Sequence, residues 1–111
     1  MMIDIPRVGP PPSSPVPRAG VEMTLTITNK IGLHMRPAKD FVAAASRYTS
    51  TIRARNLDLP DRPAGNAKSM IDVMKLGVKL GHRIHLRAEG DDALQALDAL
   101  ARLVANNFGE A

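Results

Sequence analysis

The chain has 111 residues, a formal net charge of +4 and no cysteine. This length accommodates one domain of ordinary small size and leaves no room for a second core. Without cysteine the chain has no disulfide and no thiolate metal site, which favours a reducing compartment such as the cytoplasm. No segment approaches the roughly 18 consecutive apolar residues of a membrane span, and no secretory leader opens the chain. We therefore expect a soluble cytoplasmic protein with no membrane insertion.

The excess of basic residues favours an acidic partner, which is either an acidic protein surface or a nucleic acid. The chain has only three aromatic residues, Phe41, Tyr48 and Phe108, and they are far apart in the sequence. Proteins that bind single-stranded RNA usually stack bases on aromatic side chains placed among basic ones. A small basic RNA-binding module is therefore an alternative that the composition disfavours, and we expect no nucleic-acid partner.

The first twenty residues, MMIDIPRVGPPPSSPVPRAG, contain six of the nine prolines and show no apolar periodicity. Such a segment buries too little apolar surface to offset the entropy lost on ordering. We predict a disordered proline-rich N-terminal tail over residues 1–20 and a folded domain over residues 21–111. A more specific alternative, which we favour less than a solvated tail, is that PPPSSPVP is a proline-motif ligand for a partner domain. A translation start at Met23 would remove the segment altogether.

Apolar periodicity then predicts the first elements of the domain. Residues 21–28 alternate, which indicates a half-buried strand with four inward residues: Val21, Met23, Leu25 and Ile27. After a turn at Gly32, spacing of i, i+3, i+4 and i+7 predicts a helix face: Ala38, Phe41, Val42 and Ala45. Pro37 suits the first turn of this helix, since the amide hydrogen it lacks would have no acceptor there. Residues 51–55 predict a second strand, and residues 64–67 a short third one.

The second half of the domain is predicted to contain a helix, a strand and a last helix. Ser69 can cap a short helix, SMIDVMKL, with Asp72 approximating a capping box, and Gly77 or Gly81 ends that helix. Residues 83–88 predict a fourth strand, after which Gly90-Asp91 caps the last helix. The apolar stripe predicted for that helix, stopped by Gly109, is Leu94, Leu97, Ala101, Val104 and Phe108.

The predicted order is therefore β-α-β-β-α-β-α. Every strand has one polar face, and each helix needs an apolar surface to cover. The fold class that follows is α+β: a two-layer open-faced sandwich, in which three helices cover one face of a four-stranded antiparallel sheet.

His34 is the residue most suited to chemistry, because it lies at the predicted start of a helix within NKIGLHMRP (residues 29–37). A neutral imidazole can act as a nucleophile, and a protonated one can release a bound group. The free amides and the dipole of a helix start favour an anion bound there, such as a phosphoryl group. Arg36 adds a planar guanidinium that can bind phosphate oxygens in a bidentate way. The alternative is that His34 is only a helix cap or a solvated side chain.

Three segments together resemble the HPr family, the histidine-containing phosphocarriers of the phosphoenolpyruvate-dependent phosphotransferase system. They are GLHMRPA (residues 32–38), AKSMIDVMKLG (67–77) and the strand-GDDAL-helix ending (84–108). The resemblance covers residues 21–111 and follows the predicted order of elements. It implies a carrier rather than an enzyme, with no cofactor and no metal. In this family phospho-enzyme I phosphorylates the histidine, here His34 on Nδ1, and enzyme II A-type components receive the group for sugar uptake. Arg36 would then stabilise the phosphate.

The resemblance also implies regulatory and docking residues. Ser69 matches the position that a dedicated serine kinase phosphorylates in part of the family, although the residue is equally explained as a helix cap. Met70, Ile71 and Met74 match an exposed apolar docking surface, although at least one of the three is equally explained as a core residue of this short helix. Met35 is also assigned to docking, and it departs from the family, which usually has a small residue there. Residues 56–66 are a few residues longer than usual. We expect a monomer, and a regulatory phosphorelay (nitrogen-related or catabolite-repression branch) is the alternative function within the family.

His82 and His85 raise the question of a metal site. At i and i+3 in a predicted strand they face opposite sides of the sheet, and no carboxylate spacing completes a site. We expect neither to bind a metal.

Overall fold

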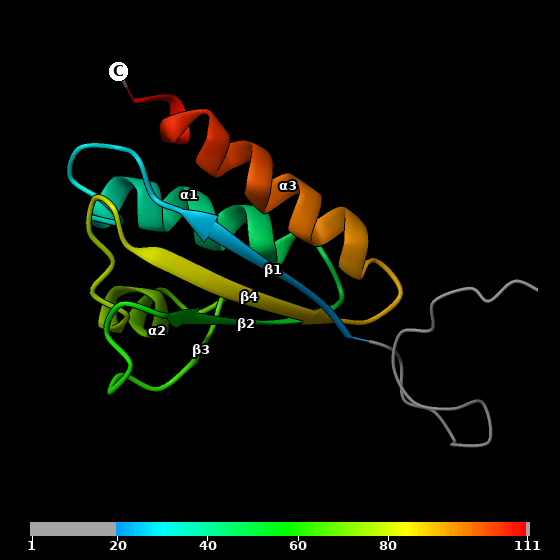
Figure 1. Cartoon of the computed structure of the whole chain (residues 1–111). Coiled ribbons are helices and arrows are strands. Elements are labelled where there is room, and N and C mark those ends of the chain that lie inside the picture. The colour runs from blue at the N-terminus through cyan, green and yellow to red at the C-terminus, as the bar shows by residue number, and fades with distance from the viewer. Residues whose placement is uncertain (1–19, 111) are drawn as a thin grey trace, which may run out of the picture.

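A computed structural model of the protein describes residues 20–110 and contains a four-stranded sheet with three helices (Figure 1). The prediction of a tail over residues 1–20 falls, apart from Gly20, outside the described residues. The strands are β1 (Gly20–Thr26), β2 (Thr51–Asn56), β3 (Gly65–Asn66) and β4 (Arg83–Glu89). The helices are α1 (Met35–Ser46), α2 (Met70–Lys75) and α3 (Ala93–Ala105), and a 3-10 turn, η1 (Asn107–Gly109), follows α3. This order confirms the predicted β-α-β-β-α-β-α arrangement.

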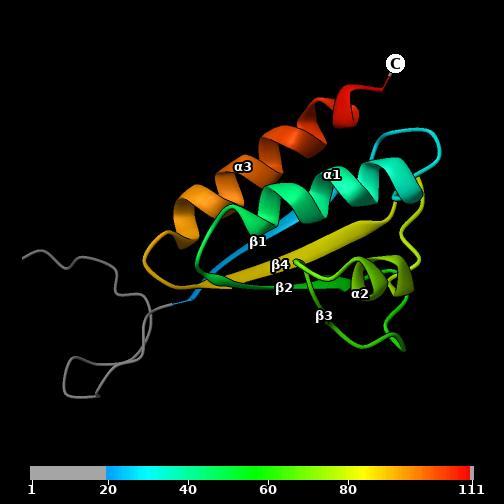
Figure 2. The same cartoon turned by 180° about the vertical axis from the view of Figure 1, so that it is seen from behind.

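The sheet has the order β1-β4-β2-β3, and every pair is antiparallel. Leu25 lies opposite Ile84 in the β1–β4 pair, and Ala54 lies opposite Leu86 in the β2–β4 pair. α1 and α3 lie side by side over one face, and α2 packs against α1 and β3 (Figures 1 and 2). The last strand in the chain thus pairs at the centre of the sheet, which brings distant segments together.

Side chains alternate between the two faces of the sheet, as the sequence pattern predicts. Ile52 and Ala54 of β2 are buried, whereas the arginines between and after them, Arg53 and Arg55, are exposed on the other face. β4 buries three residues under the helices: Ile84, Leu86 and Ala88. The predicted two-layer α+β fold is confirmed, and the face of the sheet opposite the helices is exposed to solvent. Within residues 20–110 no helix is long and apolar enough to cross a membrane.

The predicted stripe of the last helix is partly wrong. Leu94 is 66% exposed, and the buried residues of α3 are Ala93, Ala96, Leu97, Leu100 and Val104. The N-cap is Asp92 rather than Gly90-Asp91, and its carboxylate accepts hydrogen bonds from the backbone amides of Thr49 and Ser50. α3 packs against α1, β1 and β4, and this packing decides which of its apolar residues are buried, which the periodicity of α3 alone does not determine.

The end of the last helix also differs from the prediction. α3 stops at Ala105, and Phe108 is buried from the following turn rather than from the helix. Asn107 and Phe108 both adopt a positive φ, at 53° and 56°. This reversal brings the carbonyl of Phe108 and the side chain of Glu110 to Arg36 and His34 at the start of α1.

Candidate functional site

His34 is the N-cap residue of α1, with extended backbone angles of φ −75° and ψ −175°. Its carbonyl accepts the first helical hydrogen bond, from the amide of Ala38 at 2.9 Å. Its side chain makes no capping hydrogen bond, so the imidazole is not used to satisfy the helix. Pro37 lies in the first turn as predicted. The amides of Met35 and Arg36 lack acceptors within the helix because they belong to its first turn. The imidazole of His34 and two amides without helical acceptors thus lie at the same helix start.

The loop before His34 is fixed by a close approach of two backbone segments. Gly32 has a φ of +74°, and a Cβ at this position would lie 2.5 Å from the carbonyl oxygen of Val78. The next amide, that of Leu33, donates to the same carbonyl at 3.0 Å. Only glycine fits this turn without moving the neighbouring backbone. The loop between α2 and β4 therefore supports the residue pair directly before His34.

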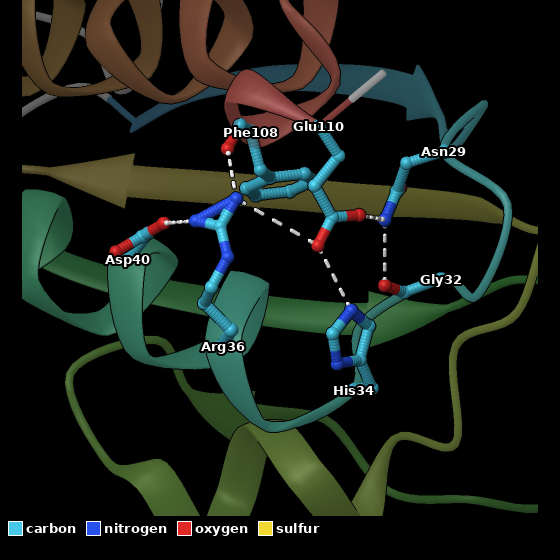
Figure 3. Close-up of polar contacts among 7 residues, drawn as sticks. All are labelled: Asn29, Gly32, His34, Arg36, Asp40, Phe108 and Glu110. Carbon is cyan, nitrogen blue, oxygen red and sulfur yellow. Dashed lines mark hydrogen bonds and ion pairs between the residues drawn. The ribbon is translucent and has the colours of Figure 1, made fainter.

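The imidazole of His34 is 35% exposed and contacts the C-terminal segment (Figure 3). Its Nε2 lies 2.9 Å from Oε2 of Glu110, a carboxylate that is 20% exposed. The other oxygen of Glu110 accepts a hydrogen bond from the Asn29 side-chain amide at 3.0 Å. That hydrogen bond, followed by the one to His34, lowers the pKa of the Glu110 carboxyl below its usual value. Nδ1 of His34 makes no hydrogen bond to any described residue, and it is the ring nitrogen that stays available.

Arg36 lies on the other side of the Glu110 carboxylate (Figure 3). Its guanidinium donates to the Phe108 carbonyl at 3.1 Å and to Asp40 of the next helical turn at 3.3 Å. It is also 3.8 Å from Oε2 of Glu110. With 53% of its side chain exposed, the guanidinium keeps donors that an incoming anion can reach. The structure thus brings the predicted pair His34 and Arg36 to one carboxylate.

Glu110, Asn29 and Phe108 are site residues that the sequence interpretation missed. Glu110 lies 76 positions from His34, and no local motif connects the two. The chain reversal at Asn107 and Phe108 creates the contact, and Thr28 reinforces it by donating to Asn107 Oδ1 at 2.6 Å. Positive φ values at residues other than glycine are set by tertiary packing, so the sequence carried no usable signal.

The predicted docking residues divide into two groups. Met35, Ile71 and Met74 are exposed, at 67%, 66% and 39%. Met70 is half-buried and packs against the core, which agrees with the alternative that one of the three residues of this helix has a core role. The start of α1 and the whole of α2 lie at the same end of the molecule (Figures 1 and 2). We call Met35, Ile71 and Met74 the apolar patch.

Ser69 caps α2, because its hydroxyl accepts a hydrogen bond from the Asp72 amide at 3.2 Å. The capping box is incomplete: Asp72 accepts from the amide of Asn66, and the amide of Ser69 donates to the Asn66 carbonyl instead. α2 ends at Lys75, and Gly77, with a φ of +63°, follows as one of the two predicted stops.

The two remaining histidines have separate neighbours. His82 precedes β4 rather than lying within it, and its Nδ1 accepts from the Lys79 amide at 3.1 Å. His85 lies in β4, with its Nε2 2.8 Å from Glu22. Among residues 20–110 no group of three or more His, Asp or Glu side chains is arranged to hold a metal ion.

Comparison with known proteins agrees with this fold. A family profile described as PTS HPr component phosphorylation site matches residues 21–106. A crystal structure of HPr from Thermoanaerobacter tengcongensis has a TM-score of 0.75 and 44% identity, covering 82% of this chain and 98% of that one. The phosphocarrier protein HPr of Pseudomonas aeruginosa is 39% identical over 89 residues, which are 79% of this chain and 94% of that protein.

The multiphosphoryl transfer proteins are longer relatives. That of Haemophilus influenzae is 41% identical over 87 residues, which are 78% of this chain but 17% of that protein. The chain therefore matches about a fifth of these relatives, whereas it matches nearly all of the HPr proteins. These findings place it among the small α+β phosphocarriers, which are carriers rather than enzymes. The chain belongs to the HPr family of the phosphotransferase system.

Proposed function

We propose that the protein accepts a phosphoryl group on Nδ1 of His34 from phosphorylated enzyme I and passes it to enzyme II A-type components in sugar uptake. The observation that carries this proposal is the position of His34 at the start of α1, where Nε2 contacts Glu110 and Nδ1 has no hydrogen-bond partner among residues 20–110. Family membership supports the same reaction.

The chemistry follows from the neighbours of the imidazole. Nδ1 supplies the electron pair for the new N–P bond, and the donor atom leaves with the pair of the bond that breaks. The amides at the start of α1 and the exposed guanidinium of Arg36 are positioned to stabilise the negative charge of the phosphoryl group. The phosphoryl group is then held in a covalent N–P bond until it is transferred to the next acceptor.

The experiment is incubation of the full chain with phosphoenolpyruvate and enzyme I, followed by intact-mass measurement. We expect an acid-labile gain of one phosphate that His34→Ala loses and that the control His85→Ala keeps, because His85 lies on the sheet beside Glu22. The Pseudomonas aeruginosa HPr serves as the positive control for the donor. A donor that phosphorylates this control but not the chain would refute the proposal.

Partner docking is proposed to use the apolar patch together with the basic charge of the chain. The patch lies at the same end of the molecule as His34, and flexible methionines adapt to differing partner surfaces. The net charge of +4 would speed encounter with acidic partners. Onward transfer to A-type components, measured as loss of phosphate from the labelled chain, tests this step.

Ser69 is proposed as a regulatory phosphorylation site for a serine kinase. A phosphate there would add about −1.5 to −2 charges beside Ile71 and Met74, which disfavours an acidic partner. The test compares Ser69→Asp with Ser69→Asn, because both side chains cap a helix but only one adds charge. Slower phosphorylation of His34 in the aspartate variant alone supports regulation, and equal rates in both contradict it.

A further inference from the structure

The side chain of Asn29 has an unusual hydrogen-bonding state. It is 2% exposed, and its amide nitrogen donates to the Gly32 carbonyl at 2.7 Å and to Oε1 of Glu110 at 3.0 Å. Its Oδ1 is buried and has no hydrogen-bond partner among the described residues. Turning the amide over would place Oδ1 against two acceptors, so the observed orientation is fixed. A buried unpaired oxygen is unfavourable. It is tolerated here because one N–H group fixes the amide to the Gly32 carbonyl, which leaves the other N–H group a single task.

That task is to hold the Glu110 carboxylate against His34 (Figure 3). One oxygen of Glu110 is occupied by Asn29, and the other lies 2.9 Å from Nε2 of His34. An ionised carboxylate only accepts hydrogen bonds, so the hydrogen between the two groups must belong to Nε2. A neutral imidazole has one ring hydrogen, and Nδ1 is then the nitrogen with the free electron pair.

We propose that Asn29 and Glu110 form a positioning pair that selects the Nε2–H tautomer of His34 and so directs phosphoryl transfer to Nδ1. This inference rests on the proposed function. When Nδ1 bonds to phosphorus, the donor atom keeps the electron pair of the broken bond and the Nε2 proton stays in place. The ring becomes a cation, and the adjacent Glu110 carboxylate stabilises that charge. The pair thus acts through His34 and does not itself touch the phosphoryl group.

Glu110→Gln provides a sharp test, because its carboxamide has a defined orientation. Asn29 presents a donor, so the glutamine oxygen faces Asn29 and the glutamine NH2 faces Nε2 of His34. A donor at that place pairs with an unprotonated Nε2 and moves the ring hydrogen to Nδ1. The substitution is expected to invert the tautomer rather than merely weaken a contact. Its matched control is Glu89→Gln, which makes the same change at the far end of β4, where Glu89 pairs with Arg87.

The measurement is long-range proton–nitrogen NMR of the His34 ring in the unphosphorylated full chain at a pH where the ring is neutral. We expect the Nε2–H form in the wild type and in Glu89→Gln. In Glu110→Gln the ratio of the two tautomers should change by about tenfold or more, because a hydrogen bond to a charged group favours one tautomer by about that factor. A wild type with Nδ1–H, or an unchanged ratio in Glu110→Gln, would overturn the positioning pair.

Phosphorylation rates then test the consequence. With phosphorylated enzyme I the initial rate should fall about tenfold in Glu110→Gln and stay unchanged in Glu89→Gln. An inverted tautomer with a normal rate would overturn the claim that the pair directs transfer. The two failures are distinguishable, because the tautomer needs no phosphoryl donor. If the wild type accepts no phosphate, the proposed function fails, while the NMR result still decides the positioning pair.

Discussion

Gly32 and Gly81 both adopt a positive φ, of +74° and +87°, but only one of them is crowded. A Cβ on Gly32 would lie 2.5 Å from the Val78 carbonyl oxygen and 2.6 Å from the Lys79 Cα, whereas a Cβ on Gly81 would meet nothing within 4 Å. Both contacts of Gly32 are to backbone, which cannot rotate away as a side chain can. Substitution by alanine at the two positions therefore separates backbone strain from steric overlap.

The magnitudes follow from these two terms. The left-handed conformation costs alanine about 1–2 kcal/mol at either position, and the reduced freedom of the unfolded chain offsets about 0.5 kcal/mol of this in both. Overlap adds about 1–3 kcal/mol at Gly32 alone. We expect Gly81→Ala to lose about 1 kcal/mol of unfolding free energy and Gly32→Ala about 2–4 kcal/mol. The difference corresponds to about 4–16 °C in melting temperature for a domain of this size.

The assay is urea unfolding at neutral pH, with the slope compared between variants to exclude a change in the unfolded state. Gly32→Ala should also slow phosphorylation of His34, because the Gly32 carbonyl accepts a hydrogen bond from Asn29 and the turn carries His34. Gly81→Ala should phosphorylate normally. Equal loss of stability in the two variants would show that the loop before His34 is not held by this close approach.

Three further predictions concern the cap of α2, the carboxylate of Asp92 and the apolar patch. Ser69→Ala should lose about 1 kcal/mol of unfolding free energy with the α2 cap, and Ser69→Asp should not; equal urea midpoints would contradict the cap. Hydrogen bonds from Ser50 and then Thr49 lower the pKa of Asp92 from 3.8 to about 2, so Asp92 stabilises the fold above its unfolded pKa and loses this as the pH falls through about 2. Asp92→Asn should flatten that part of the stability curve, and an unchanged acid slope would be evidence against it. Ile71→Ser should change stability by less than about 0.5 kcal/mol yet slow phosphoryl exchange with partners; normal exchange would remove Ile71 from the docking surface.

Local patterns account for most of the fold. The alternation in residues 51–55 places Ile52 and Ala54 inward, and the structure buries both. The serine cap, the proline in the first turn of α1 and the glycine after α2 were also predictable, because each depends on backbone groups within a few residues. Such features depend on residues that are neighbours in the sequence, so they can be predicted from it.

The rotation of α3 and the burial of Met70 show where local reasoning fails. A helix with many apolar residues fits several rotations, and the packing of α3 against α1, β1 and β4 selects the one that exposes Leu94. Met70 lies on a short helix whose spacing allows either a docking or a core role, and packing against the core decides it. Both outcomes depend on contacts between segments distant in the chain.

The sequence by itself determined the two-layer α+β fold and drew attention to His34 and Arg36, because periodicity, caps and a helix-start histidine are local properties. Only the tertiary structure decided what surrounds the imidazole. Glu110 reaches Nε2 because the chain reverses at Asn107 and Phe108, and Asn29 donates to that carboxylate from the loop between β1 and α1. The surroundings of His34 are therefore formed by three segments that meet only when the sheet, α1 and the chain end have packed together.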